Sequence, residues 1–297
     1  MIMKDLVMNV NIFLDSANHP RFKELLIRLG ATISNDDEVR FKLAPGEADL
    51  DIIWGSWKDR DTPWHNIKRE VVAKSKKFLV LETPLVGRKP TQDIMDDTWY
   101  RVGINGFLGD DGFAHTKNSP SNRYHKMHTE LGITFKPWKI AGDHVVVCLQ
   151  LPGDASLRGA DIGMWAVKVC HEIKKYTNKR IILRTPQLPR HFNINGLPND
   201  VVLQQGTAEN LQKTLDMAYC LVTYSSGIGS EALLNGTPVI AMSPASMVYS
   251  ICSNSIDEIN NPKLPERLHW ISDIGYAQWS QEELYNGDMW KYIRSKL

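Results

Sequence analysis

The sequence lacks the cysteine spacing of a disulfide framework or a zinc site. Its four cysteines, Cys148, Cys170, Cys220 and Cys252, stand singly in apolar surroundings, with no C-x-x-C pair and no nearby His at zinc-ligand spacing. We therefore expect four buried free thiols.

The sequence also lacks a membrane-spanning run and a dominant charge. No stretch reaches the roughly 18 consecutive apolar residues of a transmembrane helix, and the start of the chain does not resemble a secretory signal. The net charge is +1 with 23% charged residues, so no overall field attracts a polyanion or a membrane. These features predict a cytoplasmic protein without a membrane partner, in which any nucleic-acid contact depends on a local patch. They do not indicate the oligomeric state.

Short apolar runs alternate with helical patterns along the first part of the chain. Residues 10–15, 51–57 and 77–84 are typical of buried strands, and the helical stripes lie at residues 20–30 and 64–75. Such alternation indicates βα units around a mostly parallel sheet. The chain of 297 residues is long enough for two such domains.

Residues 85–138 interrupt this alternation with Gly-, Asn- and Asp-rich sequence, which we interpret as a long functional loop. The alternation resumes near residue 144 and continues to residue 242. We therefore expect an α/β protein with two Rossmann-like domains, residues 1–140 and 141–297, the second ending in short helices.

The segment YSSGIGSEALLNGTPVI, residues 224–240, follows an expected strand and opens an expected helix. Ser225, Ser226 and Gly227 would present hydroxyls and free backbone N–H groups at the helix start, where the partial positive charge favours a diphosphate. Glu231 would lie near enough to accept hydrogen bonds from ribose hydroxyls. The alternative is that Ser225 caps the helix and Glu231 only complements the helix dipole.

Taken together, S-S-x-x-x-x-E-A-x-x-x-G-x-P-V-I resembles the C-terminal nucleotide-sugar site of the GT-B glycosyltransferase superfamily. The resemblance implies a GT-B-like fold of two domains facing across a cleft. It also implies that the Ser/Gly segment binds the donor diphosphate and that the acid holds the ribose. Sugar-nucleotide epimerases of the same fold share this pattern.

A second resemblance rests on three blocks, YRVGINGFLGDDGF, NSPSNRYHKM and PWKIAGDHVVVCLQLPGDAS. They are similar to glycosyltransferases of tailed phages, some of which are linked to hypermodified DNA bases. Arg184 stands where that group often has Arg-x-His-Pro, although the His is missing here. Arg184 and the loop that begins at Gln150 are therefore expected to help bind the donor. A surface or packing role for Arg184 stays open.

Transfer with inversion needs a base that takes the acceptor proton, and the N-terminal domain should supply it. Asp110 and Asp111, in a Gly-flanked polar loop, are the first candidates, and Glu82 at the end of a strand is the next. Two solvated turn acids and a buried ion-pair member are the alternatives. Asp49-Leu50-Asp51 spells the D-x-D of metal-dependent transferases but precedes its strand, so we expect no essential metal or other cofactor.

Aromatic and basic residues follow the strand at residues 51–57. Basic groups beside aromatic faces can grip phosphates and stack an extruded base. A packed Trp with solvated charges is the alternative. The candidate DNA contacts are Trp57, Lys58, Arg60, Lys68 and Arg69.

The sequence thus predicts a glycosyltransferase that moves a hexose, with UDP-glucose as the expected donor. The phage resemblance implies a 5-hydroxymethylated pyrimidine in double-stranded DNA as the acceptor, in the cytoplasm of a bacterial host. The alternatives are a lipopolysaccharide or capsule glycosyltransferase, a UDP-N-acetylglucosamine 2-epimerase-like enzyme, and a binding module without activity.

Overall fold

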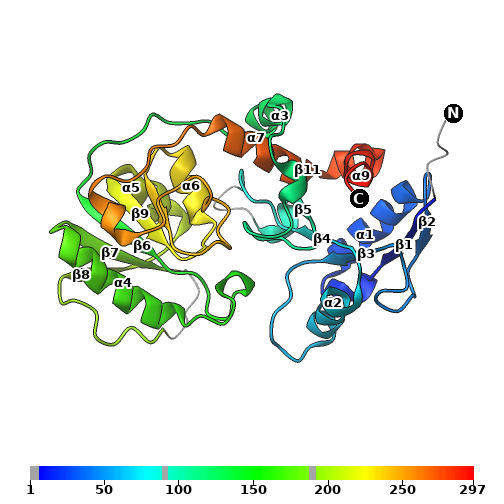
Figure 1. Ribbon diagram of the computed structural model, residues 1–297, viewed down its shortest axis with the longest axis horizontal. Helices are drawn as coiled ribbons and strands as arrows, with labels where there is room; N and C mark the ends of the chain where they lie inside the picture. The colour runs from blue at the N-terminus through cyan, green and yellow to red at the C-terminus, as the bar shows by residue number, and fades with distance from the viewer. Residues whose placement is uncertain (1–6, 89–92, 187–191) are drawn as a thin grey trace.

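The computed structural model describes residues 7–88, 93–186 and 192–297. It contains a six-stranded sheet, with strand order β11-β5-β4-β3-β1-β2, and a five-stranded sheet, with order β10-β9-β6-β7-β8 (Figure 1). The strands are β1 (Asn9–Ile12), β2 (Glu38–Arg40), β3 (Leu50–Trp54), β4 (Phe78–Glu82), β5 (Trp99–Ile104), β6 (His144–Cys148), β7 (Arg180–Thr185), β8 (Val201–Gln205), β9 (Ala218–Thr223), β10 (Val239–Ala241) and β11 (Gln278–Ser280). The α-helices are α1 (Pro20–Ile33), α2 (Pro63–Lys74), α3 (Asn122–Leu131), α4 (Ile162–Tyr176), α5 (Ala208–Asp216), α6 (Ile228–Leu234), α7 (Leu268–Ala277), α8 (Gln281–Asn286) and α9 (Asp288–Arg294).

The pairing of the strands confirms the expected α/β class. All four pairs of the five-stranded sheet are parallel. In the six-stranded sheet β2, β1, β3 and β4 are parallel, whereas β5 and β11 are antiparallel additions. The carboxyl ends of the parallel strands carry the loops on which ligand sites form in such sheets.

Local sequence explains where the long helices begin. His19 precedes α1, its Nδ1 accepts a hydrogen bond from the Arg21 N–H (3.2 Å), and Pro20 occupies the first turn. Asp161 caps α4 by accepting hydrogen bonds from the N–H groups of Gly163 and Met164. Each cap satisfies donors that have no partner within the helix.

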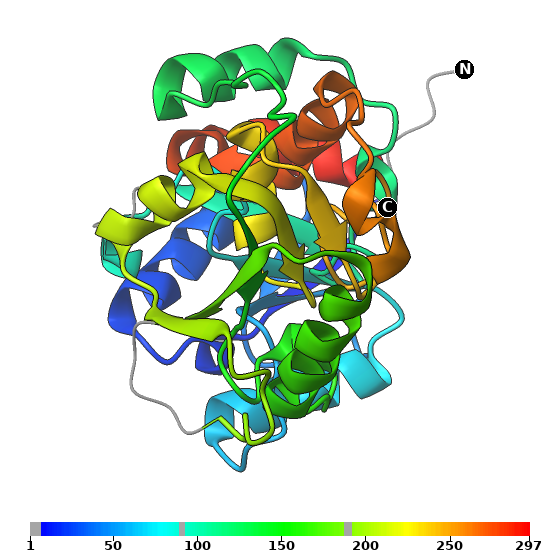
Figure 2. The ribbon, with the colours of Figure 1, turned by 90° about the vertical axis from the view of Figure 1, so that its left-hand side faces the viewer.

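Helices cover both faces of each sheet, so each half has its own core. On the first sheet α1, α8 and α9 pack on one face and α2 on the other. On the second sheet α4 packs on one face, while α5, α6 and α7 pack on the other (Figure 2). The core on the α6 side of the second sheet also includes Val86 and Trp99 of the first half, so the two halves are packed against each other.

The segment 85–138 is more ordered than its polar sequence indicates, and the expectation of one long loop is wrong. It contains β5, in which Tyr100 and Val102 are buried, and α3. Arg101, in the middle of β5, breaks the apolar run that otherwise signals a strand. Arg101 of β5 lies opposite Glu82 of the neighbouring strand β4, so a charged residue at this position is consistent with a strand.

The chain returns to the first sheet at its C-terminal end, which the sequence did not indicate. After α7, β11 pairs with β5, and α8 and α9 pack beside α1 (Figure 1). Asp37, on the first half, accepts hydrogen bonds from Trp290 Nε1 (3.0 Å) and Arg294 Nε (2.9 Å). A division of the chain at residue 140 stays a prediction, and the C-terminal helices lie on the first sheet.

All four cysteines are free and buried, as predicted. None of the helices in the described residues combines the length and the apolar character needed to cross a bilayer.

Gly236, part of the G-x-P motif, has a packing role that can be tested by substitution. Its φ is +71°, and a Cβ there would lie 2.0 Å from the carbonyl oxygen of Pro137. Gly236→Ala is therefore expected to lower the free energy of unfolding by about 2 kcal/mol or more, because both the left-handed backbone and the close approach oppose a side chain. Urea denaturation measures the change.

Gly227→Ala is the matched control, because a Cβ at Gly227 would meet nothing within 4 Å and its φ is −57°. A loss of stability in this control as large as that in Gly236→Ala would contradict the packing argument.

Candidate functional site

The expected donor residues lie at the carboxyl ends of β6, β7 and β9. Ser225, Ser226 and Gly227 connect β9 to α6, while Gln150 follows β6 and Arg184 lies near the end of β7. Since β6 lies between β7 and β9, the structure brings these segments together at one edge of the second sheet.

Ser225 and Gln150 are used within the protein. Gln150 Nε2 donates to Ser225 Oγ (3.0 Å) and to Ser156 Oγ (2.6 Å), and the Ser225 N–H donates to Gln150 Oε1 (3.2 Å). All three side chains are buried. This network fixes the loop after β6 against the loop after β9, so these two residues shape the edge of the site.

Ser226 and Gly227 form the open part of the same loop. The Ser226 N–H donates to Thr223 Oγ1 (3.0 Å), and Ser226 Oγ accepts from the Ile228 N–H (3.4 Å). Gly227 is exposed, and a Cβ there would have no neighbour within 4 Å. A ligand can therefore approach the backbone at the start of α6.

Glu231, in the first turn of α6, is a carboxylate without a partner. It is half-buried, and burial raises its pKa above the usual value. Within residues 7–88, 93–186 and 192–297 its carboxylate makes neither a hydrogen bond nor an ion pair. A partly desolvated carboxylate costs free energy unless it is hydrogen-bonded. Ligand hydroxyls at the open start of α6 would supply the missing donors.

Arg184 is buried and has two of its nitrogens engaged. Its Nη1 donates to Asn210 Oδ1 (2.5 Å) and its Nη2 to the Thr207 carbonyl (2.7 Å), whereas Nε has no partner among the described groups. Cys148 interacts with both Arg184 and Ser226. Burial raises the pKa of its thiol to about 11, although the charge of Arg184 and a hydrogen bond with Ser226 lower it. Arg184 therefore ties α5 to the edge that carries Ser226, and its Nε is buried.

Glu82, at the end of β4, lies among hydrogen-bond donors and two cations. Its carboxylate accepts from the N–H groups of Ser56 (2.8 Å) and Thr83 (2.9 Å). Burial opposes ionisation, but Arg101, these backbone N–H groups and Lys68 outweigh it and lower the pKa of Glu82. Glu82 is thus ionised at neutral pH at the carboxyl end of the first sheet.

Asp110 and Asp111 form part of the contact between the two halves. The Arg158 guanidinium, from the loop after β6, makes two contacts of 2.6 Å with Asp110 and one of 3.2 Å with Asp111. Asp111 Oδ1 also accepts from the N–H groups of Phe107 and Leu108. Both acids have partners within the protein, in contrast to a free base.

Three of the expected DNA contacts have partners within the protein. Trp57 packs against aromatic side chains, and Lys68 and Arg69 donate to backbone carbonyls. The Trp57 ring meets Phe107 (4.9 Å between centroids) and Phe78 (6.0 Å) edge to face. Arg69 donates to the carbonyls of Lys58 and Arg60, and Lys68 donates to the Ser56 carbonyl. Among the described residues Lys58 and Arg60 make no ion pair with a carboxylate, and Arg60 is exposed.

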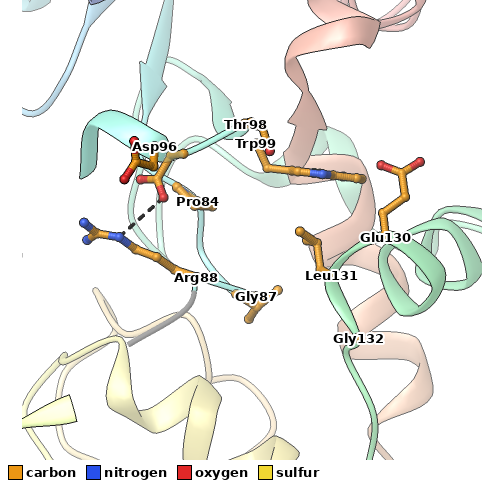
Figure 3. Close-up of a pocket in the computed structure, with 11 residues that line it drawn as sticks. Pro84, Gly87, Arg88, Asp96, Thr98, Trp99, Glu130, Leu131 and Gly132 are labelled. Carbon is orange, nitrogen blue, oxygen red and sulfur yellow. Dashed lines mark ion pairs between the residues drawn. The ribbon is translucent and has the colours of Figure 1, made fainter. Parts of the chain in front are cut away.

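A cavity of about 720 Å³ lies beyond the end of β4, and the sequence did not indicate it (Figure 3). Its wall comes from three segments, which include Arg88, Asp97, Trp99 and Glu130. Arg88 Nε lies 3.4 Å from Asp97 Oδ1. Its Val86, Trp99 and Leu131 belong to the core cluster that also contains Leu233 of α6. None of the expected site residues lines this cavity. Its wall segments are distant from one another in sequence and form no local motif, so the sequence analysis could not identify it.

Within the described residues, no group of three His, Cys, Asp or Glu side chains is placed to hold a metal ion. Asp49-Leu50-Asp51 stands at the amino end of β3, as predicted. There Asp49 Oδ2 accepts from the Asn9 N–H (2.8 Å), and Asp51 Oδ2 accepts from the Gly46 N–H (2.8 Å). The motif therefore holds neighbouring backbone. The independence from metal stays a prediction.

No protein-family model matches the chain, and no curated protein matches it in sequence. Solved structures are similar to it in fold. The KpsC beta Kdo 2,4 transferase of Thermosulfurimonas dismutans has a TM-score of 0.57 at 12% identity, over 93% of this chain and 92% of that chain. The KpsC beta Kdo 2,7 transferase of the same organism has a TM-score of 0.53 at 12% identity, over 97% and 99%. The chain therefore has a GT-B-like fold, as predicted, whereas the resemblance to phage enzymes finds no support in these comparisons.

Proposed function

We propose that the protein is a glycosyltransferase that moves a sugar from a nucleotide-activated donor to a hydroxyl acceptor. The observation that carries this proposal is the unpartnered carboxylate of Glu231 beside the open backbone at Gly227. A carboxylate suits the vicinal hydroxyls of a ribose, and the exposed Gly227 N–H suits a phosphate oxygen, whereas the neighbouring N–H groups of Ser226 and Ile228 have partners within the protein. The GT-B-like fold is consistent with such a donor.

The acceptor side of the proposal rests on Glu82. The acceptor oxygen would attack the anomeric carbon, the bond from that carbon to the phosphate oxygen would break, and the electron pair would leave with the nucleotide. Glu82 would take the acceptor proton, since it is ionised and lies at the carboxyl end of a central strand. Asp110 and Asp111 are the alternatives, and they too have partners within the protein, because Arg158 engages both.

The donor sugar is to be identified by assaying a panel of nucleotide sugars. UDP-glucose is our first choice, and the two structures of similar fold, both Kdo transferases, add a Kdo donor to the panel. Acceptors should include duplexes with 5-hydroxymethylcytosine or 5-hydroxymethyluracil, matched unmodified duplexes, and saccharides.

The test combines nucleotide binding by calorimetry with transfer of radiolabel from each donor to each acceptor. We expect a nucleoside diphosphate or monophosphate to bind and one donor to lose label to a hydroxyl acceptor. Isomerised sugar nucleotide without transfer would indicate an epimerase instead. If the wild-type protein binds no nucleotide and no nucleotide sugar, the proposal is wrong.

A further inference from the structure

Four cations gather around one histidine near the end of β3. Lys58 and Arg60 lie in the loop after β3, and Lys68 and Arg69 lie on α2. All four are close enough to His65 to lower its pKa, which burial and these charges bring to about 4. We call Lys58, Arg60, Lys68 and Arg69 the basic cluster.

The basic cluster makes no direct ion pair, although the charge of Glu82 acts on Lys68. Among the described residues, none of its four cations forms an ion pair within 4.0 Å. Lys74, on the last turn of the same helix, does pair with Glu70 (2.5 Å). Asp61, which lies just before α2, accepts a hydrogen bond from Asn66 Nδ2 (2.9 Å). Four like charges held together without a direct ion pair repel one another, so an anion would stabilise this arrangement.

Hydrogen bonds to backbone carbonyls hold the basic cluster in place. Arg69 Nη1 donates to the carbonyls of Lys58 (2.6 Å) and Arg60 (2.9 Å), which fixes the backbone of their loop. Lys68 is 5% exposed, and in the described structure its ammonium makes a single hydrogen bond, to the Ser56 carbonyl (3.2 Å). His65 is 9% exposed, and its Nδ1 is buried without a partner among the described groups. The Lys68 ammonium thus has donors left for a ligand, whereas His65 Nδ1 is enclosed by the protein.

The basic cluster lies next to Glu82. A Cβ built on Gly55, whose φ is +78°, would lie 3.0 Å from Lys68 Nζ and 3.9 Å from Glu82 Oε2. Lys68 also contributes to the low pKa of Glu82. An anion on the cluster would therefore lie beside the carboxylate that we assign to proton removal.

We propose that the basic cluster binds a phosphate group of a phosphorylated saccharide acceptor and so brings the acceptor hydroxyl to Glu82. This inference rests on the proposed function, whose acceptor it specifies. A compact phosphate fits better than a duplex, because Trp57 is packed against Phe78 and Phe107 and is not free to stack on a base. The net charge of +1 also provides no wider field for a polyanion.

Calorimetry with glucose 6-phosphate, inorganic phosphate and a 12-base-pair duplex as probes tests the proposal. We expect glucose 6-phosphate to bind, and the exposed double variant Lys58→Gln/Arg60→Gln to bind it about tenfold more weakly, since two charge-assisted contacts are lost. Lys68→Met, which keeps the length of the buried stem, should weaken binding similarly. Lys74→Gln is the matched control on the same helix and should bind as wild type does.

The same titrations with the nucleotide separate this proposal from the proposed function. The cluster variants should keep nucleotide binding, whereas Glu231→Gln should lose it and keep glucose 6-phosphate binding. Equal binding of glucose 6-phosphate by wild type and cluster variants, or none by wild type, would overturn the proposal while nucleotide binding stands. Tighter binding of the duplex than of glucose 6-phosphate, lost in the cluster variants, would overturn it in favour of a nucleic-acid acceptor.

Discussion

Replacing Arg123 with Ala should lower the free energy of unfolding by about 3–5 kcal/mol, the range for removing one partner of a buried ion pair. Arg123, on α3, is buried and makes two contacts with Glu283, at 2.5 and 3.0 Å. It also donates to the carbonyls of Gly275 and Gln278, and its guanidinium lies 3.6 Å from the centroid of the Trp279 ring. The substitution would remove the bidentate cation from a buried carboxylate, which keeps Lys126 (3.0 Å) and the Ser280 N–H (2.9 Å), and would leave two carbonyls without this donor.

Urea denaturation of the variant measures this change. Arg28→Ala is the matched control, because Arg28 pairs with Glu24 on the surface, where both side chains are more than half exposed (58% and 61%). Surface pairs contribute about 0–1 kcal/mol, so the control should lose little. A loss below about 1 kcal/mol for Arg123→Ala would show that this side chain does not anchor the C-terminal segment.

The pH dependence gives an independent check of the same contact. Burial would raise the pKa of Glu283, but the hydrogen bonds and charge of Arg123, with the Ser280 N–H and Lys126, outweigh it and lower the pKa to about 2. A depressed pKa in the folded state means that the stabilisation is complete above the usual value of 4.5 and is lost as the pH falls towards 2. Arg123→Ala should therefore show a smaller loss of stability across this acid range than the wild type.

Glu231→Gln should weaken nucleotide binding by about 10- to 100-fold, the effect of losing charge-assisted hydrogen bonds to a diol. The same substitution should keep or raise stability at neutral pH. Because the pKa of Glu231 is raised in the folded state, the folded protein binds more protons than the unfolded chain, and stability falls as the pH rises above 4.5. Gln removes the charge that causes this fall.

Calorimetry for binding and thermal denaturation between pH 5 and 8 for stability check both halves of this prediction. Glu209→Gln is the matched control, since Glu209 is an exposed acid in the first turn of the neighbouring helix α5. Unchanged nucleotide affinity in Glu231→Gln would remove the main support for a donor site at α6.

Sequence reasoning located the parallel strands that are continuous apolar runs between polar turns, but not β2, whose three residues Glu38–Arg40 include two charged side chains. It missed β5, where Arg101 interrupts the run, and β11, which has only three residues and depends on β5 for its pairing. The proximity of Ser226, Gly227 and Glu231 could be predicted because one loop and helix start carry them all, whereas their role in binding stays a prediction. The partners of Ser225 could not, since Gln150 lies 75 residues away and meets it only after the sheet has formed.

The charged contacts show the same limit. The pattern of Asp110 and Asp111 is that of an open polar turn, and Arg158, which engages both, lies 48 residues from Asp110. Likewise the positive charges after β3 were visible in the sequence, but the absence of a direct ion pair to them among the described residues was not. The distance between two charges in the folded protein decides whether they pair, and the local sequence does not specify that distance.

The return of β11, α8 and α9 to the first sheet has a consequence for the order in which the protein is made. The ribosome delivers β1 to β5 first, but β5 lacks its neighbour and one side of α1 stays bare until the segment after α7 emerges. During synthesis the second sheet has all of its strands by Ala241. We therefore expect the half that is translated last to complete its fold first, while the half translated first waits with an open strand edge that chaperones would have to shield.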